Sequence, residues 1–159
     1  MKVLLPVDGF DDAKLIMDFV SKYRWPPDTE FRVLHVVGSN DTDAAAAKAQ
    51  EVAEELVAKI AKEVRALVQE TQVSSEVRCG SAVFEIVDEA YHWKANMIVM
   101  GYRTRPAVKP YMLGTVSTGV STQASCSVAI IRPQECESTA YYAGEVLEPA
   151  RDESAPCQS

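Results

Sequence analysis

Short apolar runs alternate with longer amphipathic segments along most of this chain, and that alternation limits the fold more than any other feature of the sequence. The runs are rich in β-branched and aliphatic residues, so they predict strands at residues 2–7, 31–37, 96–100 and 128–131. A further strand is predicted at 73–79, where alternate residues are set against polar neighbours. The segments between them carry apolar residues at helical spacing. A chain in which strands and helices alternate in this way is expected to form one parallel sheet with helices on both faces.

Four helices are expected between the strands. Asp11 or Asp12 is a suitable cap for the first, and Thr42 or Asp43 for the second, which is the longest. The fourth is a helix of small residues at about 115–123. The apolar residues expected to face the sheet are Ala13, Ile16, Met17 and Val20 in the first helix, Val52, Leu56, Ile60, Val64 and Leu67 in the second, and Val83, Ile86, Val87 and Ala90 in the third.

The charge of the chain is unevenly distributed. The formal net charge is -7, and residues 134–159 hold six acidic side chains against one arginine. Neither that segment nor the rest of the chain offers the basic stripe that nucleic acid or an anionic membrane requires. No run reaches the roughly 18 apolar residues of a membrane helix, and Asp8 ends the first apolar run without a signal-peptide cleavage site. We therefore expect a cytoplasmic protein without nucleic-acid or membrane partners.

The cysteines and histidines predict neither a metal site nor a disulfide framework. The four cysteines lie far apart and form no CxxC pair, and His35 and His92 supply no second ligand cluster. His35 ends an apolar strand without a recognisable nucleophile beside it, so it is expected to be a hydrogen-bonded core residue. Residues 91–93, Tyr-His-Trp, are expected to supply aromatic packing at the end of the third helix.

In an open parallel sheet, ligands bind beyond the carboxyl ends of the strands, where the strand order reverses. Residues 6–9, 35–38 and 100–101 are expected to meet there. Asp8 then offers a carboxylate to ribose hydroxyls, and the backbone of Val36 can pair with the edge of a base. The alternative for Asp8, which precedes Gly9, is an ordinary turn or capping residue.

The start of the fourth helix is expected to form an anion site at the same edge. Gly114, Thr115, Val116 and Ser117 open that helix, and the first amides of a helix have no intrahelical acceptor. Gly101 has no Cβ, which would let a phosphate chain approach the backbone closely. The alternative is that both glycines only end a strand and start a helix, with Thr115 and Ser117 as plain caps.

The pattern of residues 6–8 (Pro-Val-Asp), 35–37 (His-Val-Val) and 98–101 (Ile-Val-Met-Gly) resembles the universal stress protein family. Nucleotide-binding members carry a glycine, two residues, a glycine, nine residues, and then a glycine followed by serine or threonine. This chain keeps the spacing from Gly101 to Gly114, but Thr104 replaces the middle glycine. The likeness extends from residue 1 to about residue 132 and includes the last strand.

The resemblance implies a three-layer, doubly wound α/β fold with five parallel strands in the order 3-2-1-4-5, similar to that of the adenine nucleotide alpha-hydrolases. It implies one domain at residues 1–132, followed by an acidic, largely irregular tail at 133–159. It also implies an adenine nucleotide ligand, ATP or AMP, with or without Mg²⁺, and a homodimer formed through the last strand. The residues that the family pattern places at the ligand are Val7, Asp8, Val36, Gly101, Gly114, Thr115, Val116 and Ser117.

Thr104 and its neighbours leave the affinity for nucleotide open. If the position requires a positive φ, a β-branched residue there costs on the order of 1–3 kcal/mol. Arg103, Arg105 and Lys109 bring three positive charges into the same loop. They can pair with phosphates, which would offset that cost, or they can form an ordinary solvated loop.

Two functions therefore stand against each other. The first is a regulatory domain that binds ATP or AMP, and the alternative is a nucleotide-free module of the same fold that binds an unidentified protein partner. An enzyme is disfavoured, because the chain has no HxGH motif, no SGGxDS loop and no GxxxxGK[ST] loop.

Overall fold

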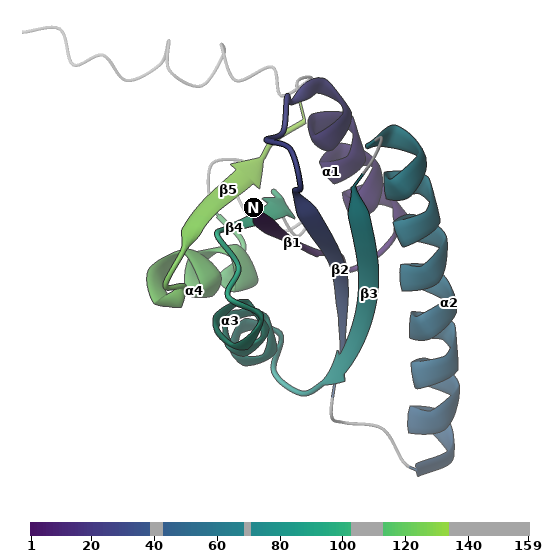
Figure 1. Cartoon of the computed structure of the whole chain (residues 1–159). Helices are drawn as coiled ribbons and strands as arrows, with labels where there is room; N and C mark the ends of the chain where they lie inside the picture. The colour runs from purple at the N-terminus through teal and green to yellow at the C-terminus, as the bar shows by residue number, and fades with distance from the viewer. Residues whose placement is uncertain (39–42, 69–70, 103–112, 134–159) are drawn as a thin grey trace, which may run out of the picture.

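The fold is a five-stranded parallel sheet covered by two helices on each face (Figure 1). The computed structural model describes residues 1–38, 43–68, 71–102 and 113–133. In chain order the elements are β1 (Lys2–Pro6), α1 (Phe10–Lys22), β2 (Glu30–Val37), α2 (Asp43–Leu67), β3 (Gln72–Cys79), α3 (Ala82–Trp93), β4 (Met97–Gly101), α4 (Thr115–Gln123) and β5 (Ser127–Ile131).

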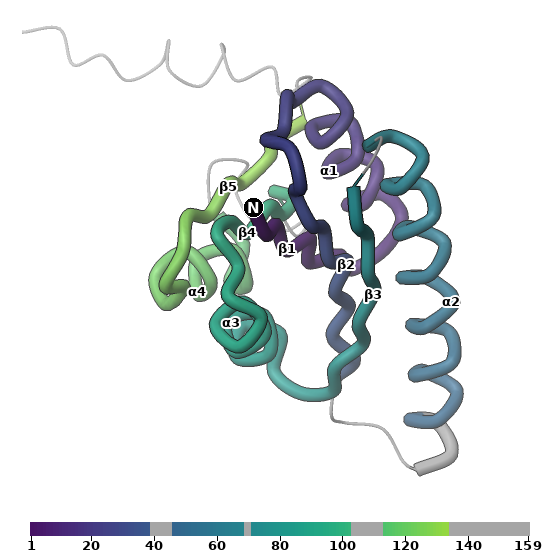
Figure 2. Tube along the Cα trace, in the orientation of Figure 1, coloured from purple at the N-terminus to yellow at the C-terminus, as the bar shows by residue number. Residues whose placement is uncertain are grey.

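The strand order is β3-β2-β1-β4-β5, with every neighbouring pair parallel. The order reverses at β1, because β2 lies on one side of it and β4 on the other. The path of the chain through this reversal can be followed in Figure 2. Both the doubly wound class and the strand order expected from the sequence are confirmed.

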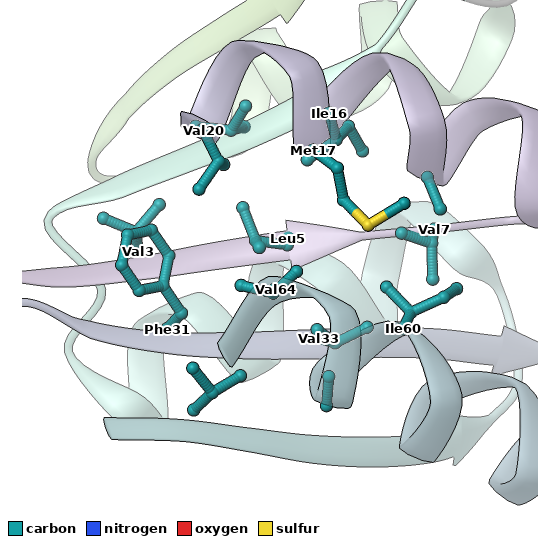
Figure 3. Packing of buried hydrophobic residues seen from close by; sticks show 14 of the residues in the cluster. Val3, Leu5, Val7, Ile16, Met17, Val20, Phe31, Val33, Ile60 and Val64 are labelled. Atoms are coloured by element: carbon teal, nitrogen blue, oxygen red, sulfur yellow. The ribbon is translucent and has the colours of Figure 1, made fainter. Parts of the chain in front are cut away.

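The two faces of the sheet have separate apolar cores. Helices α1 and α2 pack on one face, where Val3, Leu5, Phe31 and Val33 are fully buried (Figure 3). Helices α3 and α4 pack on the other face, where the buried strand residues include Leu4, Leu34 and Ile98. Alternate residues of β1 therefore serve different cores, which explains why its sequence is an unbroken apolar run rather than a period-two pattern.

The inner face of α1 is the expected one, whereas that of α2 is rotated. Ala13, Ile16, Met17 and Val20 are the buried residues of α1. In α2, Ile60 and Val64 are buried as expected, but Val52 is 57% exposed and Leu67 is 45% exposed. In each case the following residue, Ala53 or Val68, is buried instead. The buried residues of α2 and of the residue that follows it are Ala53, Val57, Ile60, Ala61, Val64 and Val68.

Two further local expectations are corrected. The N-cap of α1 is Gly9, so Asp11 and Asp12 lie inside the first helical turn rather than at the cap. Tyr91 is 67% exposed and does not join a core, whereas Trp93 is half-buried and packs against the α3 and α4 side. Thr42, Thr104 and the acidic segment 134–159 lie outside the described residues.

Helices α3 and α4 pack closely because of one glycine. A Cβ added at Gly119 would lie 2.8 Å from Val83 Cγ2 and 2.9 Å from Val83 Cγ1. Since real Cβ atoms almost never approach other atoms so closely, any larger residue at 119 would push the two helices apart. Among the described helices, none is long and apolar enough to cross a membrane.

Candidate functional site

A cleft of about 140 Å³ opens at the carboxyl ends of β1, β2 and β4, next to the reversal of strand order. Its walls are mostly apolar. Residues from the strand ends and from the N-terminal parts of α1, α3 and α4 form them: Pro6, Val7, Asp8, Asp12, Leu34, Val36, Ala82, Ile86, Met100, Gly101, Val116 and Ser117. The volume is below the roughly 300–1,000 Å³ of typical small-molecule sites.

The backbone of Val36 faces this cleft. In β2, odd and even residues bond opposite neighbours: the carbonyl of Val37 accepts from the amide of Gly80 after β3, and the carbonyl of Leu34 accepts from the amide of Val7 after β1. By this alternation the amide and carbonyl of Val36 point to the β1 side. The paired register of β1 with β2 ends at Pro6 and Leu34, so these groups lie beyond the last paired residue.

The side chain of His35 contacts the backbone of the segment that carries Asp8. Its Nδ1 lies 2.8 Å from the carbonyl oxygen of Val7, and the ring is half-buried. This ring contact and the bond from the Val7 amide to Leu34 both hold the segment just after β1 against β2. His35 thus acts as the hydrogen-bonded structural residue that the sequence predicts.

The first turn of α4 presents its amides at the cleft. Gly114 is the N-cap and makes no side-chain capping bond, and the helical bonding begins with the amide of Thr118, 2.9 Å from the carbonyl of Gly114. The amides of residues 115–117 consequently have no intrahelical acceptor. Val116 lines the cleft, and Ser117 lines it with a side chain that is only 3% exposed.

Two carboxylates, from Asp8 and Asp12, line the same cleft. Asp8 is exposed and Asp12 is half-buried. Burial raises the pKa of the Asp12 carboxyl above its usual range, and the negative charge of Asp11 adds to the rise. Gly101 lies beside Asp12: a Cβ added to Gly101 would be 3.7 Å from Asp12 Oδ1. That distance is an ordinary contact, so the packing of the protein alone does not require glycine at 101.

Helix α3, which forms the wall opposite α1, is held to the sheet by charged side chains. Arg78 on β3 lies 2.7 Å from Asp88 Oδ2, 3.3 Å from Glu85 Oε2 and 2.5 Å from Glu89 Oε2. Glu89 also lies 2.5 Å from Arg32 Nη1. Burial would lower the pKa of Arg78, but Asp88, Glu89 and Glu85 together raise it above its ordinary value. These pairs position Ala82 and Ile86 at the cleft.

Six of the eight site residues expected from the sequence line this one cleft, namely Val7, Asp8, Val36, Gly101, Val116 and Ser117. Gly114 and Thr115 directly precede Val116 at the start of α4 and are not among the lining residues. Asp12 also lines the cleft, although its sequence context predicted only a helix cap. The helical spacing of Asp12 from Ile16, one turn earlier on the same side of α1, is the signal that could have placed it near the sheet.

The described residues contain no group of three His, Cys, Asp or Glu side chains able to hold a metal ion. Asp8 and Asp12 are the carboxylates among the residues lining the cleft. A Mg²⁺ ion at this place would therefore need ligand oxygens in addition to these side chains.

The fold and the cleft define a doubly wound α/β protein with an opening at the switch point of its sheet. The model of the universal stress protein family matches residues 1–132, and the chain belongs to that family. A search of curated protein sequences finds no match.

Solved structures share the fold at low sequence identity. A hypothetical protein determined as a test case of structural genomics is 22% identical, with a TM-score of 0.74, covering 84% of this chain and 96% of that one. A universal stress protein from Archaeoglobus fulgidus in complex with dAMP is 24% identical, with a TM-score of 0.58 and coverage of 82% and 97%. An Arabidopsis thaliana family protein with AMP bound is 15% identical, with a TM-score of 0.64 and coverage of 87% and 95%.

Proposed function

We propose that this chain is a cytoplasmic regulatory protein, not an enzyme, that binds an adenine nucleotide, ATP or AMP, in the cleft at the strand ends. In this proposal residues 1–132 form the binding domain and residues 133–159 an acidic tail. The observation that carries the proposal is the convergence on one cleft of an apolar slot, the backbone of Val36 and the first amides of α4, which have no intrahelical acceptor.

Each part of the cleft suits one part of a nucleotide. Ile86 and Val116 offer apolar surface to the base, and the amide and carbonyl of Val36 match the donor and acceptor on an adenine edge. The carboxylate of Asp8 can accept hydrogen bonds from ribose hydroxyls. The first amides of α4 suit an anionic group, because they combine donors that have no intrahelical acceptor with the positive end of the helix dipole. The dAMP and AMP complexes of the structural relatives support the same ligand class.

The test is equilibrium binding to the full chain after any carried-over ligand has been removed by unfolding and refolding. Mass spectrometry of the released material should identify an adenine nucleotide, and calorimetry should then detect ATP or AMP binding. Failure to detect binding at millimolar ATP would reject the proposal. It would instead favour a nucleotide-free module that binds a protein partner.

Gly114 offers a variant that separates binding from folding. Its φ of -60° and ψ of 155° are accessible to any residue, so Gly114→Val should leave the free energy of unfolding nearly unchanged. The added side chain should crowd an anion at the first amides of α4 and weaken nucleotide binding by about ten-fold or more. Thr104→Gly should leave the affinity equal or tighter, and weaker binding by that variant would show that Thr104 contributes to the site.

The proposal includes a homodimer formed through β5. Among the described strands, β5 pairs with β4 alone, and its apolar residues from Val128 to Ile131 are half-exposed. The carbonyl of Ile131 accepts from Tyr102 on the β4 side, so the amide of Ile130 points outward. Ile130→Pro should therefore abolish the dimer in sedimentation experiments while the monomer stays folded. A wild-type chain that sediments as a monomer at high concentration would contradict the dimer.

A further inference from the structure

The hydrogen-bond ladder between β1 and β2 stops at the edge of the cleft. Its last described bond runs from the amide of Val7 to the carbonyl of Leu34, at 2.8 Å, one residue past the paired register. In a parallel ladder each residue bonds the two neighbours of its partner, so the next bond would run from the amide of Val36 to the carbonyl of Val7. The backbone bonds of the described residues do not include this one.

The side chain of His35 bonds the carbonyl of Val7 instead. Its Nδ1 lies 2.8 Å from that oxygen, and because a carbonyl only accepts, Nδ1 is the ring nitrogen that carries the proton. By alternation along β2 the ring lies on the same face of the sheet as the side chain of Val33, which packs under α1 and α2. The bond to the ring therefore directs the carbonyl of Val7 toward that face and away from the amide of Val36.

The amide of Val36 has one hydrogen to donate, so a bond to Val7 and a bond to a ligand would exclude each other. Val36 and Val7 both line the cleft. If the ladder continued by one more bond, the donor that the proposed function assigns to the base would be used within the sheet. The contact between His35 and Val7 prevents this.

Resting on the proposed function, we propose that His35 is a positioning residue for base recognition, which holds the carbonyl of Val7 and so keeps the amide of Val36 available to an adenine edge. His35 acts through Val7 and does not itself contact the base. Val7 is only 6% exposed, so its carbonyl needs another donor once the ring is removed. The amide of Val36 is the donor that the ladder supplies.

Hydrogen exchange followed by NMR on the full chain without ligand tests the backbone part of this inference. His35→Phe keeps a ring but removes the donor, so the amide of Val36 should bond Val7 and exchange at least about ten-fold more slowly than in the wild type. His35→Asn restores a side-chain N–H donor and should return the rate to within about two-fold of the wild type. His92→Phe is the matched control and should leave the rate unchanged. His92 also has Nδ1 near a backbone carbonyl, at 3.0 Å, but it lies on α3 and does not line the cleft.

Calorimetric titration of the same variants with adenosine and inosine tests the recognition part. Inosine has a carbonyl oxygen where adenosine has its amine, so it does not match the amide and carbonyl of Val36. The wild type should therefore prefer adenosine by about ten-fold or more. The preference should fall below about three-fold in His35→Phe and should persist in His35→Asn and His92→Phe. A merely structural role of His35 would lower both affinities together and leave their ratio unchanged.

The possible failures are distinguishable. If the wild-type chain binds neither nucleoside, the proposed function is wrong and base recognition by Val36 is wrong with it. If adenosine is preferred but His35→Phe leaves either the exchange of Val36 or the affinity ratio at the wild-type value, only the role of His35 is wrong. Faster exchange of Val36 in His35→Phe would also overturn that role. Thermal unfolding shows whether each variant is folded, and His35→Ala carries the same two expectations if the phenylalanine variant does not fold.

Discussion

The two faces of the sheet are built differently. The face under α1 and α2 is a continuous apolar core with fully buried residues on both helices and strands, such as Ile16, Phe31, Ile60 and Val64. The face under α3 and α4 has a smaller apolar core, which is bordered by the arginine and glutamate pairs on one side and by the cleft at the strand ends. The first face is packed throughout, whereas the packing of the second face is interrupted by the cleft at the strand ends.

The largest expected effect tests the first face directly. Phe31→Ala should lower the free energy of unfolding by about 3–5 kcal/mol, because the ring is fully buried and packs edge-on against Trp25 at 5.1 Å. Leu34→Ala is the control on the same strand. Leu34 is equally buried but lines the cleft, so the space left there joins an existing opening and the loss should be smaller. Urea denaturation measures both, and equal losses would contradict the comparison.

The next effect concerns the charged border of the second face. Glu89 is 3% exposed and pairs with both Arg32 and Arg78. Glu89→Gln should cost about 2 kcal/mol, below the 3–5 kcal/mol of a fully buried pair, because the arginines are partly solvated. Glu85→Gln should cost less than about 1 kcal/mol, because Arg78 keeps Asp88 and Glu89. If both variants unfold at the same urea concentration, Glu89 is not the centre of this network.

A smaller effect is expected where α3 meets α4. Gly119→Ala should destabilise the protein by about 1 kcal/mol, because the clash with Val83 outweighs the gain in helix propensity. In a Val83→Ala background the same change should be stabilising, since the clashing methyls are gone. A double-mutant cycle measured by urea denaturation gives the coupling. If the effects of Gly119→Ala and Val83→Ala on the free energy of unfolding are additive, α4 can shift away from α3 without cost, and the predicted clash is wrong.

The smallest effect distinguishes the two carboxylates of α1. Because burial raises the pKa of folded Asp12, this residue adds stability at low pH that is lost as the pH rises through its folded pKa. Asp12→Asn should therefore be more stable than Asp11→Asn by a few tenths of a kcal/mol at neutral pH. The helix dipole acts on both carboxylates alike, so it cancels in this difference. Unfolding at several pH values should show the difference vanishing near pH 3.

Much of the fold could be predicted because it follows from local patterns. The apolar runs and helical spacings specify the elements, and parallel topology brings the strand ends to one edge. The buried face of α2 was harder to predict, because Val52 and Leu56 form one possible apolar stripe and Ala53 and Val57 form another beside it. Alanine is a weak indicator of which stripe is buried. Which stripe is buried depends on how the helix packs against β2 and β3, and spacing alone does not contain that information.

The candidate site was predictable at the strand ends and much less so at its borders. Residues such as Asp8 and Val36 end apolar runs, so their position follows once the strands are known. Asp12, by contrast, reaches the cleft through the angle at which α1 leaves β1. The pairing of Glu89 with Arg32 and Arg78 joins residues more than ten positions apart on α3, β2 and β3. Such contacts follow from tertiary packing rather than from any local pattern.

The two tryptophans of the chain lie on opposite faces of the sheet. Trp25 packs with Phe31 on the side of α1 and donates its indole N–H to the carbonyl of Val20 at 2.9 Å. Trp93 packs on the side of α3, with the guanidinium of Arg32 4.5 Å from its ring centre. Each indole is therefore a natural fluorophore for one face. Replacing them one at a time with phenylalanine would give two emission signals, from which the order in which the faces loosen during unfolding can be read.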